Sequence, residues 1–156
     1  MRSSLGPITF VAILLVATAT GGADAPTPKP QDFRGKVQPL SAVLDKYGVK
    51  MDADAAAQSM ALVGDDGKIY PLIKDDATRM FFKDTAILNR PMQLRARLLD
   101  GNYLHVLEVH SIVKGDLCEI YYWCDVCSIR RMEKRTCECC GGPMVLKEVL
   151  LPKKKD

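Results

Sequence analysis

Five of the chain's six cysteines lie within one short stretch, residues 121–144. Cys124 and Cys127 form one Cys-x-x-Cys pair, and Cys137 and Cys140 form a second pair. A two-residue interval lets a tight turn aim both sulfurs at one point, and two such turns facing each other complete a tetrahedron of thiolates around a metal ion. We therefore expect these four residues to be the ligands of a metal ion, with residues 121–144 as a metal-binding knuckle.

The pattern resembles that of zinc ribbons and rubredoxin-like knuckles, whose hallmark is CxxC…CxxCG, with Gly141 here following the second pair. Ser128 stands after the first pair, where rubredoxin-type knuckles usually have glycine, and the interval between the pairs is shorter than in rubredoxin. These departures favour zinc, with iron as the alternative. The resemblance implies a structural site and no activity. More broadly, the chain resembles small exported bacterial proteins of uncharacterised function that end in such a cluster.

Disulfides and thiol-redox or metal-handling chemistry remain the rival interpretations of the cysteines. Six is an even number, and an exported chain meets an oxidising compartment in which disulfides persist. Redox enzymes, however, usually place the motif at the start of a helix in a βαβ unit, whereas Cys124 follows an expected strand. Cys139 could replace Cys140 in an alternative ligand set. Cys118 is expected to be a small buried residue, and it could instead form a disulfide with Cys139.

Four cations lie between the two pairs: Arg130, Arg131, Lys134 and Arg135. They could offset the negative charge of four thiolates around a divalent ion and lower the pKa of the thiols. A merely solvated loop is the plainer interpretation. Residues 130–135 could also bind an anion or a nucleic acid.

The remaining candidate residues indicate no enzyme. In a strand, Tyr121 and Trp123 share one face and Tyr122 takes the other. His105 and His110, the two histidines, are five residues apart and are expected on opposite faces of one strand. The chain has no GxSxG, HExxH, Walker or Rossmann motif. We therefore expect a non-enzymatic binding or interaction module, whose partner could be another exported protein or an anionic ligand.

The elements that must position the cysteines are mostly short strands. Alternating apolar and polar residues with turn signals between them predict a mainly β fold, a small antiparallel barrel of the OB-like or SH3-like kind with one or two short helices. The single domain is expected over residues 39–156. Strands are predicted at 60–64, 68–74, 91–99, 103–113, 117–123 and 144–151, and helices at 40–47 and 75–82, with 51–59 a loop or weak helix.

The start of the chain has the layout of a secretory signal peptide over residues 1–23. Arg2 precedes an apolar run over residues 8–17, and small residues follow. This run is too short to span a bilayer, and nothing after it is longer. A proline-rich linker is expected over residues 24–38. We therefore expect an exported protein, periplasmic or secreted. The 156-residue chain carries a formal charge of only +3, which by itself favours no anionic partner.

Overall fold

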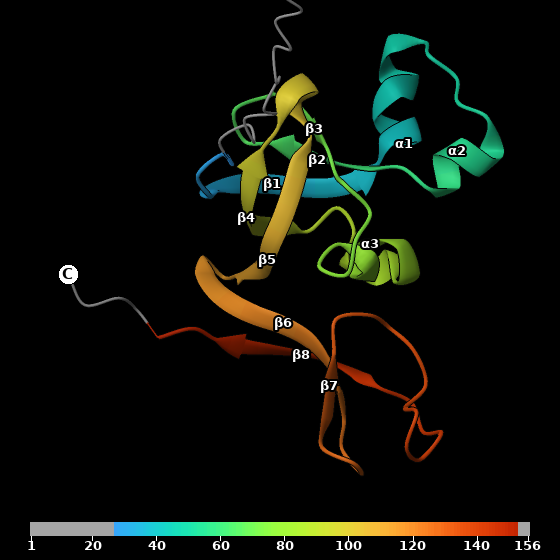
Figure 1. Ribbon diagram of the computed structural model, residues 1–156, viewed down its shortest axis with the longest axis vertical. Coiled ribbons are helices and arrows are strands. Elements are labelled where there is room, and N and C mark those ends of the chain that lie inside the picture. The colour runs from blue at the N-terminus through green and yellow to red at the C-terminus, as the bar shows by residue number, and fades with distance from the viewer. Residues whose placement is uncertain (1–26, 153–156) are drawn as a thin grey trace, which may run out of the picture.

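The structure, a computed structural model, describes residues 27–152 (Figure 1). The predicted signal peptide and the lysine-rich tail lie outside the described residues. The strands are β1 (Gln31–Pro39), β2 (Met60–Gly64), β3 (Ile69–Pro71), β4 (Pro91–Leu98), β5 (Leu104–Val113), β6 (Asp116–Cys124), β7 (Ile129–Arg131) and β8 (Val145–Leu150). The helices are α1 (Leu40–Leu44), α2 (Ala53–Ala57) and α3 (Arg79–Lys83), with 3-10 turns at Asp45–Tyr47, Thr85–Ile87 and Asp100–Asn102.

The eight strands form one open antiparallel sheet, in the order β3-β2-β1-β4-β5-β6-β7, with β8 also paired to β6. The mainly β class is thus confirmed, but the predicted barrel is wrong, because no ladder of paired strands closes the sheet in residues 27–152. The sheet curls far enough for one isolated parallel bridge, between Leu72 and Leu104. The Ile73 N–H donates to the Leu104 carbonyl there at 3.0 Å.

β1, like the short β7, is a strand that the sequence interpretation missed. It pairs with β2 on one side and β4 on the other, so it lies inside the sheet. The sheet thus begins before residue 39, and β1 occupies much of the segment 24–38 that was assigned to a linker. Phe33 and Val37 are the alternate residues that turn inward, and Val37 is fully buried. Gly35 lies between them, where a Cβ atom would lie 2.1 Å from the Val63 carbonyl oxygen.

The helix predicted at 40–47 forms as α1 and the turn after it, whereas the helix predicted at 75–82 begins only at Arg79. α1 continues into a 3-10 turn and stops at Gly48, whose φ of 74° is left-handed. The segment before α3 is ordered by Asp75, whose side chain accepts hydrogen bonds from the N–H groups of Ala77 and Thr78, both at 3.1 Å. Pro71 ends β3, the edge strand of the sheet, as its missing N–H leads one to expect.

A β-bulge in β5 overturns the expected placement of the histidines. His105 pairs with Arg97 and His110 with Gln93, so the five-residue step in β5 matches a four-residue step in β4. The register shifts where one extra residue, Leu107, is inserted in β5. Both histidines therefore face the same side of the sheet, although they remain too far apart along the strand to share a ligand.

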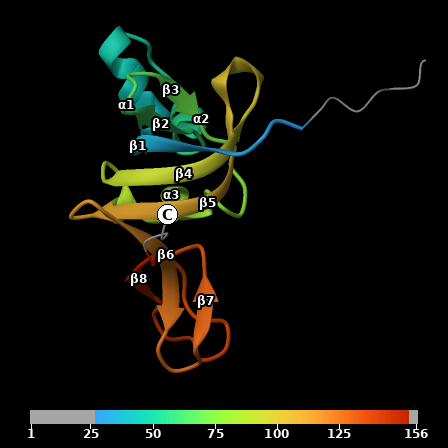
Figure 2. The same ribbon diagram turned by 90° about the vertical axis from the view of Figure 1, so that its left-hand side faces the viewer.

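The last three strands form a unit that projects from the end of the sheet (Figures 1 and 2). β6 pairs with β5 only over Asp116–Glu119. It pairs with β8 over Cys118–Trp123, and beyond the end of the β5 pairing it pairs with β7 over Tyr122–Cys124. The inward residues of β6, Cys118, Ile120, Tyr122 and Cys124, are buried. They belong, apart from Cys118, to the same apolar core as the main sheet.

Candidate metal centre

The structure brings the four predicted cysteines together at the far end of the β6–β8 unit. Cys124 ends β6, Cys127 lies in the turn before β7, and Cys137 and Cys140 lie in the loop before β8. Their sulfurs all lie within 4.8 Å of one another, and the Cys124 and Cys140 sulfurs are 3.5 Å apart. Tetrahedral zinc with Zn–S bonds of about 2.3 Å separates its sulfurs by about 3.8 Å. The cluster could therefore hold a metal ion. Binding itself stays a prediction.

Each pair sits in a turn of the same form. The Ser128 N–H donates to the Cys124 carbonyl at 2.9 Å, and the Gly141 N–H donates to the Cys137 carbonyl at 2.8 Å. Ser128 has a φ of 55° and Gly141 a φ of 70°. Both residues are thus left-handed. Ser128 adopts the conformation for which glycine is favoured, and the first turn forms in spite of that.

Three thiols of the cluster, those of Cys124, Cys127 and Cys137, have a shifted pKa. Hydrogen bonds from the backbone N–H groups of Cys140 and Cys139 lower the pKa of Cys137 to about 6. The Cys139 thiol, followed by burial, raises the pKa of Cys127. The backbone N–H of Cys127 acts to lower the pKa of Cys124, but burial and the neighbouring thiols outweigh it and raise the pKa. Cys137 is thus more acidic than an ordinary thiol, and a metal ion would displace the protons of the thiols that it binds.

The two remaining cysteines take different positions, and all six thiols are free. Cys118 is 3% exposed and shares the inward face of β6 with Cys124, as expected of a small buried residue. Cys139 is exposed and does not belong to the four-sulfur group, which contains Cys140. The alternative ligand set with Cys139 therefore has less geometric support.

The basic loop pairs with carboxylates. Each cation has a partner: Arg130 with Glu119 at 2.6 Å, Arg131 with Glu138 at 3.1 Å, Lys134 with Asp84 at 3.2 Å, and Arg135 with Glu133 at 3.2 Å and Glu138 at 2.5 Å. These contacts are with carboxylates, so they do not support the expected role of the four side chains as charge partners of the thiolates. Their ion pairs instead attach the knuckle to the rest of the fold and to itself.

A buried polar cluster fixes the knuckle loop to the core. Asp84 is only 6% exposed. It accepts hydrogen bonds from the Tyr122 hydroxyl at 2.9 Å, the Lys134 ammonium at 3.2 Å and the Ala86 N–H at 3.1 Å. Burial acts to raise the pKa of Asp84, but these three donors together lower it. The sequence interpretation missed this contact. Its one signal was that Tyr122 lies on the inward face of its strand, where a hydroxyl needs a partner.

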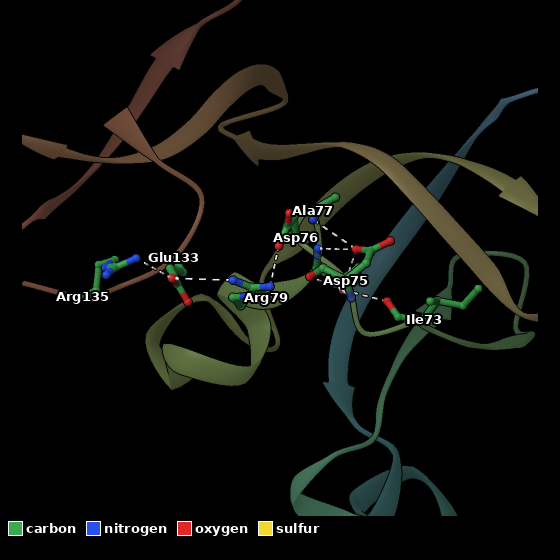
Figure 3. A network of polar contacts seen from close by, with 8 residues as sticks. Ile73, Asp75, Asp76, Ala77, Arg79, Glu133 and Arg135 are labelled. Atoms are coloured by element: carbon green, nitrogen blue, oxygen red, sulfur yellow. Dashed lines mark hydrogen bonds and ion pairs between the residues drawn. The ribbon is translucent and has the colours of Figure 1, made fainter. Parts of the chain in front are cut away.

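A second, more exposed network joins the knuckle to α3 (Figure 3). Arg79 pairs with Asp76 and, at 3.9 Å, with Glu133 of the knuckle. Glu133 in turn accepts a hydrogen bond from the Arg135 guanidinium at 3.2 Å. The middle of the loop between the two cysteine pairs is thus held to α3 through Glu133. The next residue, Lys134, points inward to Asp84.

The outer face of β6 carries the aromatic residues predicted to share it. The rings of Tyr121 and Trp123 meet edge to face with centroids 6.3 Å apart. The Arg130 guanidinium lies over the Tyr121 ring, 4.2 Å from its centroid. Tyr122 lies on the opposite, buried face, as its place in the alternation predicts.

Comparisons with known proteins add no family to this description. No family model matches the chain, and no curated protein or solved structure is detectably similar to it.

Proposed function

We propose that the four cysteines form a structural zinc site that holds the β6–β8 unit of a non-enzymatic binding module. The observation that supports this proposal is that the sulfurs of four cysteines lie within 4.8 Å of one another: Cys124, Cys127, Cys137 and Cys140. Four protein ligands would leave no coordination position for substrate water, so such a metal supports structure rather than catalysis. Ser128 and the short interval between the pairs favour zinc over iron.

The proposal predicts how metal content responds to each cysteine. We expect the purified mature protein to contain one zinc ion per chain, measured by mass spectrometry of the metals. Cys127→Ser should lose the metal, because three ligands remain. Cys139→Ser is the matched control, since Cys139 is exposed and lies outside the four-sulfur group. A wild-type protein with neither metal nor free thiols would overturn the proposal in favour of disulfides. A coloured protein that contains iron would show that the metal is iron rather than zinc.

Metal handling is the second candidate, and one observation favours it. Cys140 is exposed although it belongs to the cluster, and the neighbouring Cys139 is exposed too. An incoming thiol or chelator could therefore reach the metal from that side. We expect slow zinc loss to a chelating dye if the site is structural. Rapid loss that slows in Cys139→Ser would favour transfer through that thiol.

We also propose that the protein is exported, supported by the apolar run over residues 8–17 and the small residues after it. In the described part of the chain, no helix is both long and apolar enough to cross a bilayer. The intact mass of the protein recovered from its source should correspond to a chain that begins at Asp24. A chain that retains residues 1–23 would contradict export by this signal.

A further inference from the structure

A cleft of about 650 Å³ lies where β6 diverges from β5. Its lining comes from the knuckle loop on one side, and from β5, β6 and the start of α3 on the other. Its volume is in the range of small-molecule sites. Neither the metal nor the buried Asp84 cluster uses this space.

The two walls of the cleft have opposite charge. The knuckle wall contributes Arg130, Arg131 and Arg135 against the carboxylate of Glu133, while Glu138, outside the lining, pairs with Arg131 and Arg135. The facing wall contributes three carboxylates, from Asp76, Glu108 and Glu119, against the single guanidinium of Arg79. The lining as a whole is therefore neutral, yet it is divided into a positive wall and a negative wall. Leu107, Val109 and Met132 supply apolar surface between them.

One of the ion pairs in the cleft is exposed enough to be exchanged. Arg130 reaches Glu119 at 2.6 Å, with side chains 44% and 38% exposed. Arg79 reaches Glu133 at 3.9 Å, but the Glu133 side chain is only 16% exposed. An exposed pair such as Arg130–Glu119 contributes little to stability. A ligand that offers charges of both signs could replace such a pair at little net loss.

The edge of β5 beside the cleft also lacks a partner strand. β6 pairs with β5 only from His110 onward, and the bridge to Leu72 lies at Leu104. Between them, within the described residues, Leu107 and Glu108 have no paired strand on the cleft side. The bulge at Leu107 belongs to this same segment. An extended main chain could form hydrogen bonds to an unpaired edge of this kind.

From these observations we propose that the cleft binds a small zwitterion, a short peptide with a free amino and a free carboxyl terminus. The carboxylate lies against the knuckle arginines, whose guanidinium groups can bind it in bidentate fashion. The ammonium lies against the carboxylates of the facing wall, and the peptide backbone lies along the β5 edge. A simple anion would leave the negative wall unsatisfied. This inference deepens the proposed function and rests on it, because the knuckle forms the positive wall.

Matched ligands test the charge requirement on the zinc-loaded mature protein. Tri-alanine, its N-acetyl form, its C-terminal amide, free alanine and succinate would be titrated and followed by amide NMR shifts. We expect saturable binding of tri-alanine at the cleft, and weakening by about fivefold or more with either terminus capped. Stronger binding of free alanine would assign the site to amino acids. Equal binding of the capped forms or of succinate, or no saturation by any ligand, would overturn the proposal.

Single variants assign each terminus to its wall. Arg131→Gln should weaken the binding of tri-alanine but leave the binding of its C-terminal amide unchanged. Glu108→Gln should weaken the binding of tri-alanine but leave the binding of the N-acetyl form unchanged. Arg95→Gln is the control, because Arg95 lies outside the cleft and its side chain is 47% exposed. Zinc content is measured for each sample. A zinc-loaded protein that does not bind tri-alanine would overturn the peptide proposal alone. A metal-free protein that binds tri-alanine would overturn the zinc proposal alone.

Discussion

Within residues 27–152, Asp84 is the one buried charged side chain, and both Tyr122 and Lys134 donate hydrogen bonds to it. The hydroxyl and the ammonium both donate to a carboxylate that burial would otherwise disfavour. Removing one donor leaves that carboxylate less well satisfied, which is costly inside a protein. The three residues come from β6, the end of α3 and the knuckle loop, so they join the four-cysteine unit to the segment that follows α3.

Tyr122→Phe should destabilise the fold by about 1.5–3 kcal/mol, the usual loss for a hydrogen bond to a charged group. Urea unfolding followed by fluorescence measures this change. Tyr121→Phe is the matched control on the outer face of the same strand, and its effect should stay within about 0.5 kcal/mol. Equal effects of the two changes would show that the bond to Asp84 contributes nothing.

Asp84 also predicts an acid dependence. Its pKa is lowered in the folded state from an ordinary value of 3.8. The stability that it contributes is therefore fully present above that ordinary value, and is lost as pH falls through the lower folded pKa. Unfolding free energy measured against pH should fall steeply below 3.8 in the wild type and less steeply in Asp84→Asn. Asp76→Asn, at a side chain 90% exposed, should keep the wild-type slope.

The left-handed residues after each cysteine pair predict opposite changes. Ser128→Gly should stabilise the metal-loaded protein by about 0.5–1 kcal/mol, because it relieves a strained φ of 55°. Gly141→Ala should destabilise it by about 1–2 kcal/mol through the backbone alone. A Cβ atom at Gly141 meets no atom within 4 Å, so no steric clash confuses this comparison. Thermal unfolding of the loaded variants measures both effects, and a shift of the same sign in both would contradict the argument.

At the scale of elements, the knuckle could be predicted from sequence and β1 could not. Each cysteine pair is a local turn, so its spacing alone encodes where the two sulfurs point. The strand β1 depends on partners far along the chain, and the prolines before it resemble a linker. The bulge at Leu107 has no sequence signal either, since it reflects how β5 fits β4. The convergence of Asp84, Tyr122 and Lys134 likewise follows from packing of distant segments.

Gly35 is the most demanding position in β1. Gly35→Ala places a Cβ atom 2.1 Å from the Val63 carbonyl oxygen, so β1 and β2 must move apart. We expect a loss of about 1–3 kcal/mol, typical of overpacking, measured by urea unfolding. Lys36→Ala is the control at an exposed neighbour in the same strand. A neutral Gly35→Ala would show that β1 is less tightly paired than the register indicates.

At the scale of the whole molecule, one core spans two units joined by a single long strand. Cys124, Cys137 and Met144 of the knuckle share the core with Leu62 and Leu94 of the main sheet. β6, however, touches β5 over only four paired positions. Because its strand pairing to the main sheet is this short, we expect the β6–β8 unit to open before the main sheet does.

Metal removal should test this division. With a zinc chelator, amide hydrogen exchange should accelerate in β7 and β8, while β1, β2 and β4 keep their protection. Cys127→Ser without chelator should give the same pattern, and Cys139→Ser should resemble the loaded wild type. Exchange that rises equally throughout the sheet would contradict the division into two units.

The register of β1 also sets the order in which the chain can assemble. Its residues Gln31–Lys36 pair with residues of β4 that lie 55 to 65 positions later in the chain. During synthesis β1 therefore emerges long before its second neighbour, and one of its edges stays open until β4 appears. Such distant pairing slows folding because the intervening loop must close first. Among the described strands, β6, β7 and β8 come last in the chain, so the four cysteines are made only after both partners of β1 have emerged.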